Sequence, residues 1–203
     1  ENVLRKESAL DIIQKFIHCK DNKTLIFPRF HQLDVVRKLI ADVRQNGTGV
    51  NYLIQHSAGS GKSNSIAWLA YRLSSLHDEE DNKIFDSVIV VTDRRILNSQ
   101  LQDTIYQFDH VDGTVVRIKD NDRSELLQEA IENNKKIIIT TISRFPIIYK
   151  DLDSNGKRFA VIIDEAHQGQ SGKNVTKLKE GLGNIEEVLE EYARQELQDE
   201  NSR

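Results

Sequence analysis

The sequence predicts an α/β fold in which a mostly parallel β-sheet carries helices on both faces. Beyond residue 50, short apolar segments alternate with longer segments whose apolar residues recur at helical spacing, as in chains built from β-α-β units. The short segments are continuous apolar runs rather than alternating ones, which is typical of parallel strands buried on both faces. The length of 203 residues suits one domain of this kind, with or without extensions.

Two helices are expected before the first strand. Residues 8–17 carry apolar residues at helical spacing, with Ser8 as a candidate N-cap, and residues 29–45 repeat the pattern. The segment NGTG at 46–49 has the composition of a turn. We therefore expect the apolar run VNYLIQ that follows, at 50–55, to form a buried strand.

Strands and helices are then expected to alternate. Apolar runs predict strands at 87–92, 113–118, 136–141 and 159–163. Helical spacing predicts helices at 62–76, about 95–108, 124–133, a short stretch at 143–151 disturbed by Pro146, and an acidic helix after 184. The polar, glycine-rich residues 168–184 are expected to form a loop.

Composition narrows the class of protein. No stretch approaches the roughly 20 apolar residues of a membrane span, so we expect no membrane partner. Cys19 is the single cysteine and can form no internal disulfide, which suits a reducing, cytoplasmic setting. The formal net charge of −4 argues against nucleic-acid binding by the whole surface, although a local basic track is compatible with it.

The segment HSAGSGKS at 56–63 joins the first expected strand to the helix that begins near Lys62. Gly59 and Gly61 lack the Cβ atoms that would block a phosphate, and they allow the backbone to turn its amides toward one. The N-terminal end of the helix adds positive potential. Lys62 can reach the β- and γ-phosphates, and the hydroxyl of Ser63 can bind Mg²⁺. These residues predict a nucleotide-phosphate site.

The other residues of this loop are His56, Ser57, Ala58 and Ser60, and we expect the whole loop to surround the nucleotide. His56 occupies the first position of the pattern G-x-x-x-x-G-K-[ST], where glycine is usual. Its simplest role is packing at the end of the strand. The segment QSGKN at 170–174 also contains Gly-Lys, but it has no preceding strand and no Ser or Thr after the lysine, so it is interpreted as an ordinary loop.

Two adjacent carboxylates end the strand at 159–163. The carboxyl ends of parallel strands meet at one edge of a sheet, so Asp164 is expected near the Mg²⁺, and Glu165 can orient or deprotonate the attacking water. The alternative is an acidic helix N-cap without chemistry. Together with the glycine-rich loop, the pair indicates hydrolysis of ATP or GTP.

The tetrad DEAH at 164–167 after such a loop resembles the superfamily-two helicases and translocases. FPRFHQ at 27–32 resembles their adenine-recognising Q motif, and VVTDRRILNSQ at 90–100 and ITTISRF at 139–145 resemble motifs that line the nucleic-acid track. The segments LIQHSAGSGKS, VTDRRILNSQL, IIITTISRFP and RFAVIIDEAHQGQSG together are similar to the restriction (motor) subunit of type I restriction–modification enzymes. The resemblance covers roughly residues 1–175.

This resemblance implies an ATP- and Mg²⁺-dependent motor with a RecA-like P-loop NTPase fold. Members of the family pull double-stranded DNA past a site-bound complex and then cleave it, together with modification (methyltransferase) and specificity subunits, in the cytoplasm of a bacterial or archaeal cell. Carried over to this sequence, Gln32 with Arg29 reads adenine, while Arg94, Thr140 and Thr141 lie along the DNA backbone. From the residues alone, arginines such as Arg94 are equally well explained as solvated loop charges.

The resemblance also divides the chain. We expect an N-terminal helical linker at 1–28, the first RecA-like ATP-binding motor domain at 29–183, and an acidic C-terminal helix at 184–203. Because methionine is absent even at position 1, we expect a piece of a longer polypeptide. We find no equivalent of the family's nuclease residues or of its second motor domain, so we expect nucleotide binding with poor turnover.

Two other functions stay open at this point. One is a different superfamily-two DNA or RNA helicase or remodeller. The other is a nucleotide-sensing binding module without motor activity, against which Glu165 argues, because a sensor needs no carboxylate to activate water.

Overall fold

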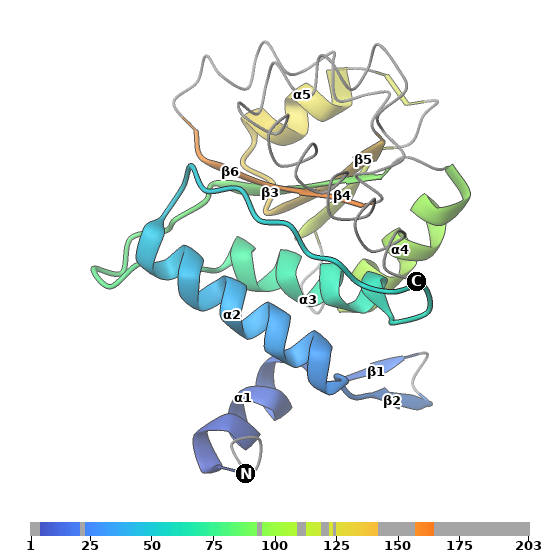
Figure 1. The fold of residues 1–203 in the computed structure, drawn as a ribbon. Helices are drawn as coiled ribbons and strands as arrows, with labels where there is room; N and C mark the ends of the chain where they lie inside the picture. Colours follow the sequence, from blue (N-terminus) through green and yellow to red (C-terminus); the bar gives the residue numbers. More distant parts are fainter. Residues whose placement is uncertain are drawn as a thin grey trace, which may run out of the picture.

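A parallel four-stranded sheet forms the centre of the structure (Figure 1). The computed structural model describes residues 5–20, 23–92, 95–108, 113–118, 122–123, 125–141 and 157–164. The strands of the sheet are β3 (Ser87–Thr92), β4 (Val115–Arg117), β5 (Ile137–Thr141) and β6 (Phe159–Ile163), in the order β4-β5-β3-β6.

The register of the sheet aligns the carboxyl ends of its strands. Val90 of β3 lies opposite Ile139 of β5 on one side and Ile162 of β6 on the other. The backbone N–H of Asp164 donates to the Val91 carbonyl oxygen at 2.9 Å, which extends the pairing one residue beyond β6. The side chain of Asp164 therefore begins where β6 leaves the sheet.

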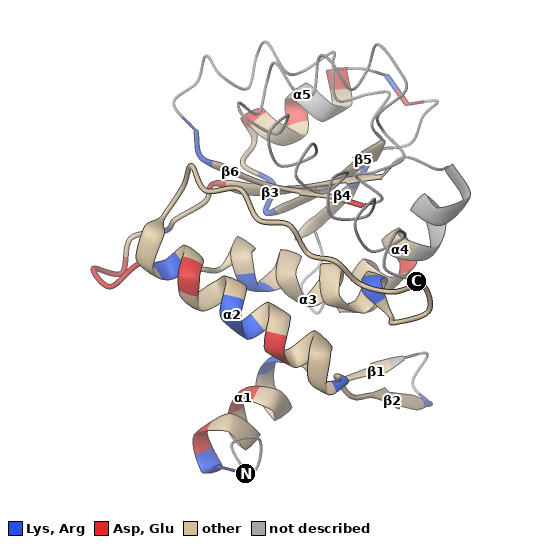
Figure 2. Cartoon of the chain, in the orientation of Figure 1, with Lys and Arg blue, Asp and Glu red and all other residues tan. Residues whose placement is uncertain are grey.

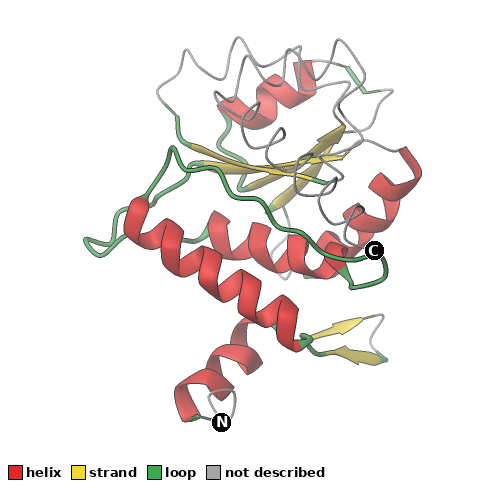
Figure 3. Cartoon of the chain, in the orientation of Figure 1, coloured by secondary structure: helices red, strands yellow, loops and turns green. Residues whose placement is uncertain are grey.

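Helices cover both faces of this sheet (Figure 3). They are α1 (Lys6–Lys15), α2 (Phe30–Asn46), α3 (Lys62–Ser74), α4 (Arg95–Gln107) and α5 (Glu125–Glu132). Helix α5 lies on one face; α3 and α4 lie on the other, and α2 packs against α3. A small antiparallel hairpin, β1 (His18–Lys20) and β2 (Thr24–Ile26), connects α1 to α2.

Burial on both faces explains why β3 and β5 consist almost entirely of β-branched residues. Val90 and Ile139 belong to the main core on the side of α3, whereas Ile138 packs with Ile131 on the side of α5. Every residue of β3 and β5 is buried. Such strands need β-branched residues at successive positions rather than at alternate ones.

The predicted α/β class is confirmed, as are the four strands from residue 87 onward and the helices that begin near 62, 95 and 124. The hairpin between α1 and α2 was not predicted, because its two strands are only three residues long. The predicted helices at 143–151 and after 184 and the loop at 168–184 lie outside the described residues.

The prediction of a buried strand at 50–55 is wrong for this structure. Residues 50–57 have no regular secondary structure, and Val50, Leu53 and Ile54 are 46%, 43% and 38% exposed. The hydroxyl of Tyr52 donates to the Asp42 carboxylate of α2 at 2.6 Å, so the segment is tied to a helix. An apolar run becomes a strand only where the edge of a sheet accepts its backbone, and β6 ends the described sheet on one side without it.

Ser8 is not the N-cap that the sequence suggested. Helix α1 begins two residues earlier, after Arg5, and the Ser8 hydroxyl accepts a hydrogen bond from Arg37 Nη1 at 2.9 Å. Helix α1 is held to α2 and α3 because Arg37 and Arg72 both bond Asp11. The proposed domain boundaries remain a prediction. Among the described residues, no helix combines the length and hydropathy needed to cross a bilayer.

Candidate nucleotide-binding site

The loop that leads into α3 has the backbone shape that its glycines allow. Gly59 and Gly61 have φ angles of +74° and +86°, a region that residues with a Cβ atom rarely adopt. Gly61 is the N-cap of α3, so the loop delivers its amides to the positive end of that helix. A Cβ atom on Gly59 would meet nothing within 4 Å, which leaves the outer side of the loop open.

The first turn of α2 holds the inner side of the same loop. The Gln32 amide nitrogen donates to the carbonyl oxygens of Ser60 (3.2 Å) and Gly61 (2.9 Å). The Gln32 amide oxygen accepts from the backbone N–H of Arg29 at 2.8 Å, which fixes the orientation of the amide. Gln32 is 2% exposed. Both ends of its side chain are therefore bonded to the protein.

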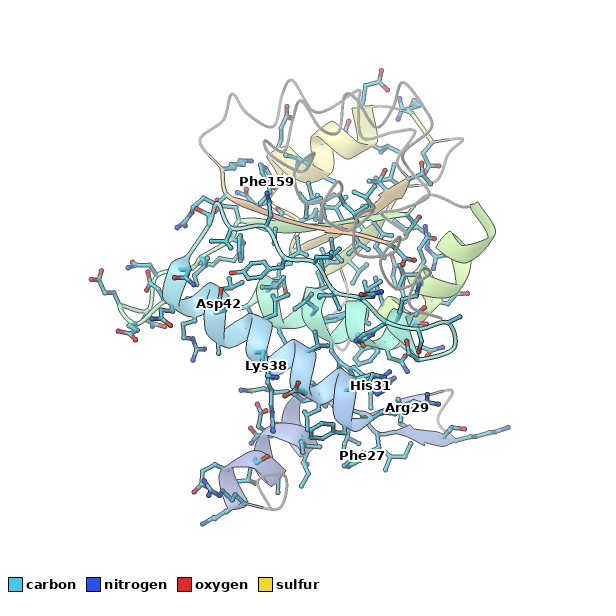
Figure 4. The ribbon with its side chains drawn as sticks, in the orientation of Figure 1. Phe27, Arg29, His31, Lys38, Asp42 and Phe159 are labelled. Atoms are coloured by element: carbon cyan, nitrogen blue, oxygen red, sulfur yellow. The ribbon has the colours of Figure 1, made fainter. Side chains whose placement is uncertain are left out.

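Two neighbours of Gln32 reach the loop as well. Arg29 Nη1 donates to the Gly59 carbonyl oxygen at 3.4 Å, and His31 Nε2 lies 3.1 Å from the Ser60 carbonyl oxygen. Figure 4 shows Arg29 and His31 together at the beginning of α2. We call Arg29, His31 and Gln32 the loop brace. It binds the carbonyl oxygens of Gly59, Ser60 and Gly61 rather than the loop amides.

His56 lies beside the brace at the start of the loop. Its ring is 5.3 Å from that of His31, in an edge-to-face arrangement. Burial lowers the pKa of His56, and the nearby His31 and Lys62 lower it further. The lowered pKa favours the neutral imidazole of His56 over the charged form. Ser57 and Ala58 are exposed at the tip of the loop.

Two side chains with oxygen atoms suited to Mg²⁺ lie at the same end of the sheet. Ser63 is the second residue of α3, and Asp164 follows β6; both are half-buried. Helix α3 packs against β6 and begins at the end of the sheet toward which the strands point (Figure 1). A hydroxyl and a carboxylate are hard donors that fit Mg²⁺ when nucleotide phosphates and water complete its shell. The described residues contain no group of three or more His, Cys, Asp or Glu that could hold a metal without the nucleotide.

Comparison with known proteins identifies the family. A family model described as the SWI2/SNF2 ATPase matches residues 31–188, more than three quarters of the chain. The chain belongs to the SWI2/SNF2 ATPase family. The matched region begins within the loop brace and includes the glycine-rich loop and Asp164, so most of the geometry described above lies within the ATPase domain.

This SWI2/SNF2 ATPase also resembles a curated protein of Mycoplasma pneumoniae (strain ATCC 29342 / M129 / Subtype 1). That relative is described as the C-terminal part of the endonuclease subunit of a putative type I restriction enzyme, MpnIIP, and the two are 25% identical over 193 residues. The alignment covers 87% of this chain and 89% of that relative. The similarity therefore extends over nearly the whole of both chains.

Four further residues of this SWI2/SNF2 ATPase were expected to contact DNA or to activate water. Thr140 and Thr141 are 0% and 2% exposed at the end of β5, and within the described structure the Thr140 hydroxyl has no hydrogen-bond partner. Neither side chain faces solvent in this conformation. Arg94 and Glu165 lie outside the described residues.

The sequence did not predict the hydrogen bonds between the loop brace and the glycine-rich loop. Gln32 and Arg29 were expected to face adenine, which remains a prediction, whereas in this conformation the Gln32 amide bonds the loop. One local signal was available: Gln32 is the third residue of α2, where a glutamine commonly bonds the N-cap backbone. That signal predicts the bond to Arg29 but not the bonds to a loop about thirty residues away.

Proposed function

We propose that this SWI2/SNF2 ATPase is the ATP-driven motor region of a type I restriction endonuclease R subunit, which translocates double-stranded DNA before cleavage. The observation that carries the proposal is the phosphate loop at the start of α3, with positive-φ glycines, facing the same sheet end as Asp164. The similarity to part of a putative restriction endonuclease, over most of both chains, supports the restriction context.

In this proposal the roles follow from position. Backbone amides of residues 56–63 and the ammonium of Lys62 bind the phosphates, and Ser63 and Asp164 hold Mg²⁺ through oxygen. The bound Mg²⁺ would neutralise phosphate charge. Glu165, next in the chain, orients or deprotonates the attacking water.

Adenine would be bound by residues of the segment at 27–32, and DNA by residues of the segments at 90–100 and 139–145. Gln32 with Arg29 would select adenine once its amide exchanges loop carbonyls for the base. Arg94, Thr140 and Thr141 would contact DNA phosphates, which position DNA without reading its sequence; for the two buried threonines this requires the end of β5 to be uncovered. Modification and specificity subunits would supply recognition of the DNA site, in the cytoplasm of a bacterial or archaeal cell.

The nucleotide assignment is tested by one substitution. Lys62→Ala should weaken binding of a fluorescent ATP analogue with Mg²⁺ by about tenfold or more, because a charge-assisted contact to phosphate is lost. The matched control is Lys173→Ala, which removes the lysine of the second Gly-Lys pair and should leave affinity unchanged. Equal binding by wild type and Lys62→Ala would refute the phosphate-loop assignment.

The second candidate is a superfamily-two remodeller or helicase outside restriction, because the family match describes an ATPase and names no restriction function. Hydrolysis by the complete polypeptide distinguishes the two. A restriction motor should be stimulated by double-stranded DNA and not by RNA, and Glu165→Gln should bind ATP but abolish that stimulated hydrolysis. Stimulation by RNA alone would favour the second candidate.

A further inference from the structure

A pocket lies at the opposite end of α3 from the phosphate loop. It has a volume of about 330 Å³ and opens between α1, α2, the last turn of α3 and the end of α4. The residues that matter for its chemistry are Lys15, His18, Arg44, Tyr71, Arg72 and Phe108. No residue of the phosphate loop lines this pocket.

Positive charge is concentrated at this pocket around one carboxylate. Asp11 bonds Lys15 at 3.1 Å, Arg37 at 2.9 Å and Arg72 at 3.3 Å. Arg44 forms no ion pair with an acidic side chain in the described part of the chain. Figure 2 shows Lys and Arg on α1, α2 and α3. Three cations thus share one anion, and Arg44 adds a fourth positive charge near Arg72, in a chain whose net charge is −4.

Asp11 does not cancel the repulsion that Arg72 experiences from the other cations. Burial lowers the pKa of Arg72, Asp11 raises it, and the neighbouring Arg37 and Arg44 lower it again. The Arg72 side chain is only 16% exposed, so water screens this repulsion weakly. An additional anion near Arg44 and Arg72 would reduce the repulsion between them.

The interior of the pocket is aromatic. The His18 ring, 5% exposed, lies 3.6 Å from the Phe108 ring centre, and Tyr71 stacks on Phe108 at 5.9 Å. The Tyr71 hydroxyl donates to the Ile105 carbonyl oxygen at 3.1 Å, so its polar end already has a partner. These rings offer contact area rather than polar groups to a ligand.

We propose that this pocket is a binding site for a small organic anion, with a phosphate or carboxylate head held by Lys15, Arg44 and Arg72. The body of the ligand, apolar or planar, packs against His18, Tyr71 and Phe108. The pocket volume falls at the lower end of the range for small-molecule sites, and its lining is divided between polar and apolar groups, which suits a ligand with a charged head and an apolar body. The site is separate from the nucleotide site.

Trp68 makes the proposal testable in the intact chain. It is the single tryptophan, it is 1% exposed, and its ring lies 5.8 Å from Phe108 and 6.2 Å from His18. Its indole N–H donates to the Phe16 carbonyl oxygen at 2.8 Å. One indole N–H resonance in an NMR spectrum therefore reports on this pocket.

The probe is phenyl phosphate. Inorganic phosphate represents the charged head alone, and benzyl alcohol represents the aromatic body alone. We expect phenyl phosphate to shift the Trp68 resonance saturably, and each fragment to bind about tenfold more weakly or worse. Arg44→Gln and Lys15→Gln should each weaken phenyl phosphate by about tenfold, because each removes a charge-assisted contact.

Two variants control for general charge and for the nucleotide site. Lys38→Gln removes one positive charge from α2 at an exposed position paired with Asp34 (Figure 4) and should leave phenyl phosphate affinity unchanged. Lys62→Ala should also leave it unchanged. The proposal is overturned if no saturable shift occurs, if Lys38→Gln weakens binding as much as Arg44→Gln, or if Lys62→Ala abolishes it.

Discussion

At the scale of single residues, the shape of the glycine-rich loop before α3 depends on two glycines with different surroundings. Gly59 and Gly61 share a positive φ, but a Cβ atom on Gly61 would lie 2.5 Å from Gln32 Nε2, whereas one on Gly59 would meet nothing within 4 Å. Gly61 is therefore constrained by its own backbone and also by the loop brace.

The two glycines provide a matched pair of alanine variants. Gly59→Ala should lower the free energy of unfolding by about 1–2 kcal/mol, the cost of a left-handed backbone with a Cβ atom. Gly61→Ala should cost about 1–2 kcal/mol more, because Gln32 must move and its two loop hydrogen bonds weaken. Urea unfolding followed by Trp68 fluorescence measures both. Equal losses would mean that Gln32 moves aside without cost.

At the scale of elements, α1 is attached to the ATPase domain through one carboxylate and one ring. Asp11 bonds Arg37 of α2 and Arg72 of α3, and both guanidinium groups lie near the Phe16 ring, at 5.9 and 5.3 Å from its centre. Phe16 is 1% exposed and in contact with Trp68. The segment before α2 is thus part of the main core.

Asp11→Asn should therefore loosen α1 by removing the charge that three cations share. We expect a loss of about 1–3 kcal/mol in the free energy of unfolding at pH 7. The control, Asp34→Asn, breaks an exposed i,i+4 pair with Lys38 and should cost about 0.3–0.5 kcal/mol. Urea titrations of the two variants and the wild type give both values, and similar small losses would contradict a structural role for Asp11.

The pH dependence of that loss has a definite sign. Burial tends to raise the pKa of Asp11, but hydrogen bonds from Lys15 and Arg37 and the charge of Arg72 outweigh it, so the pKa is lowered. Because the pKa is lowered, the ionised Asp11 stabilises the fold at pH values above its ordinary pKa of 3.8. This stabilisation is lost as the pH falls through the pKa of Asp11 in the folded state. The difference between wild type and Asp11→Asn should be constant from pH 5 to 8 and shrink below about pH 4.

At the scale of the whole molecule, net charge limits what this chain does with DNA unaided. The chain carries a formal charge of −4, and affinity for DNA grows with each phosphate that is neutralised. The attraction between individual arginines and DNA phosphates is therefore opposed by repulsion from the net negative charge of the chain.

We expect the 203-residue chain to bind a DNA duplex with a Kd no tighter than about 10⁻⁵ M near 150 mM salt, and more tightly near 50 mM. Fluorescence anisotropy with a labelled duplex at the two salt concentrations measures this. Arg94→Gln should reduce the salt dependence by about one phosphate contact. Nanomolar binding near 150 mM salt would show that the chain presents a basic surface strong enough to overcome its net charge.

Most strands of the sheet and the glycine-rich loop could be predicted from the sequence, because each depends on a pattern of neighbouring residues. β3 and β5 follow from runs of Val and Ile that burial on both faces explains, and β6 follows from a similar run of which only Ala160 is buried. The start of α3 follows from Gly61 and Lys62 at the junction of loop and helix. By contrast, the run at 50–55 has the same local signal as a strand but is tied to α2 through Tyr52.

By itself, the sequence determined the α/β class, the glycine-rich loop before α3 and the strand that Asp164 follows, because spacing along the chain carries each of these. Only the tertiary structure decided that Gln32 holds the loop carbonyls, that Thr140 is buried, and that Asp11 serves several cations beside an aromatic pocket. These features join segments dozens of residues apart. Their partners are chosen by how helices pack on the sheet, and local periodicity does not record that choice.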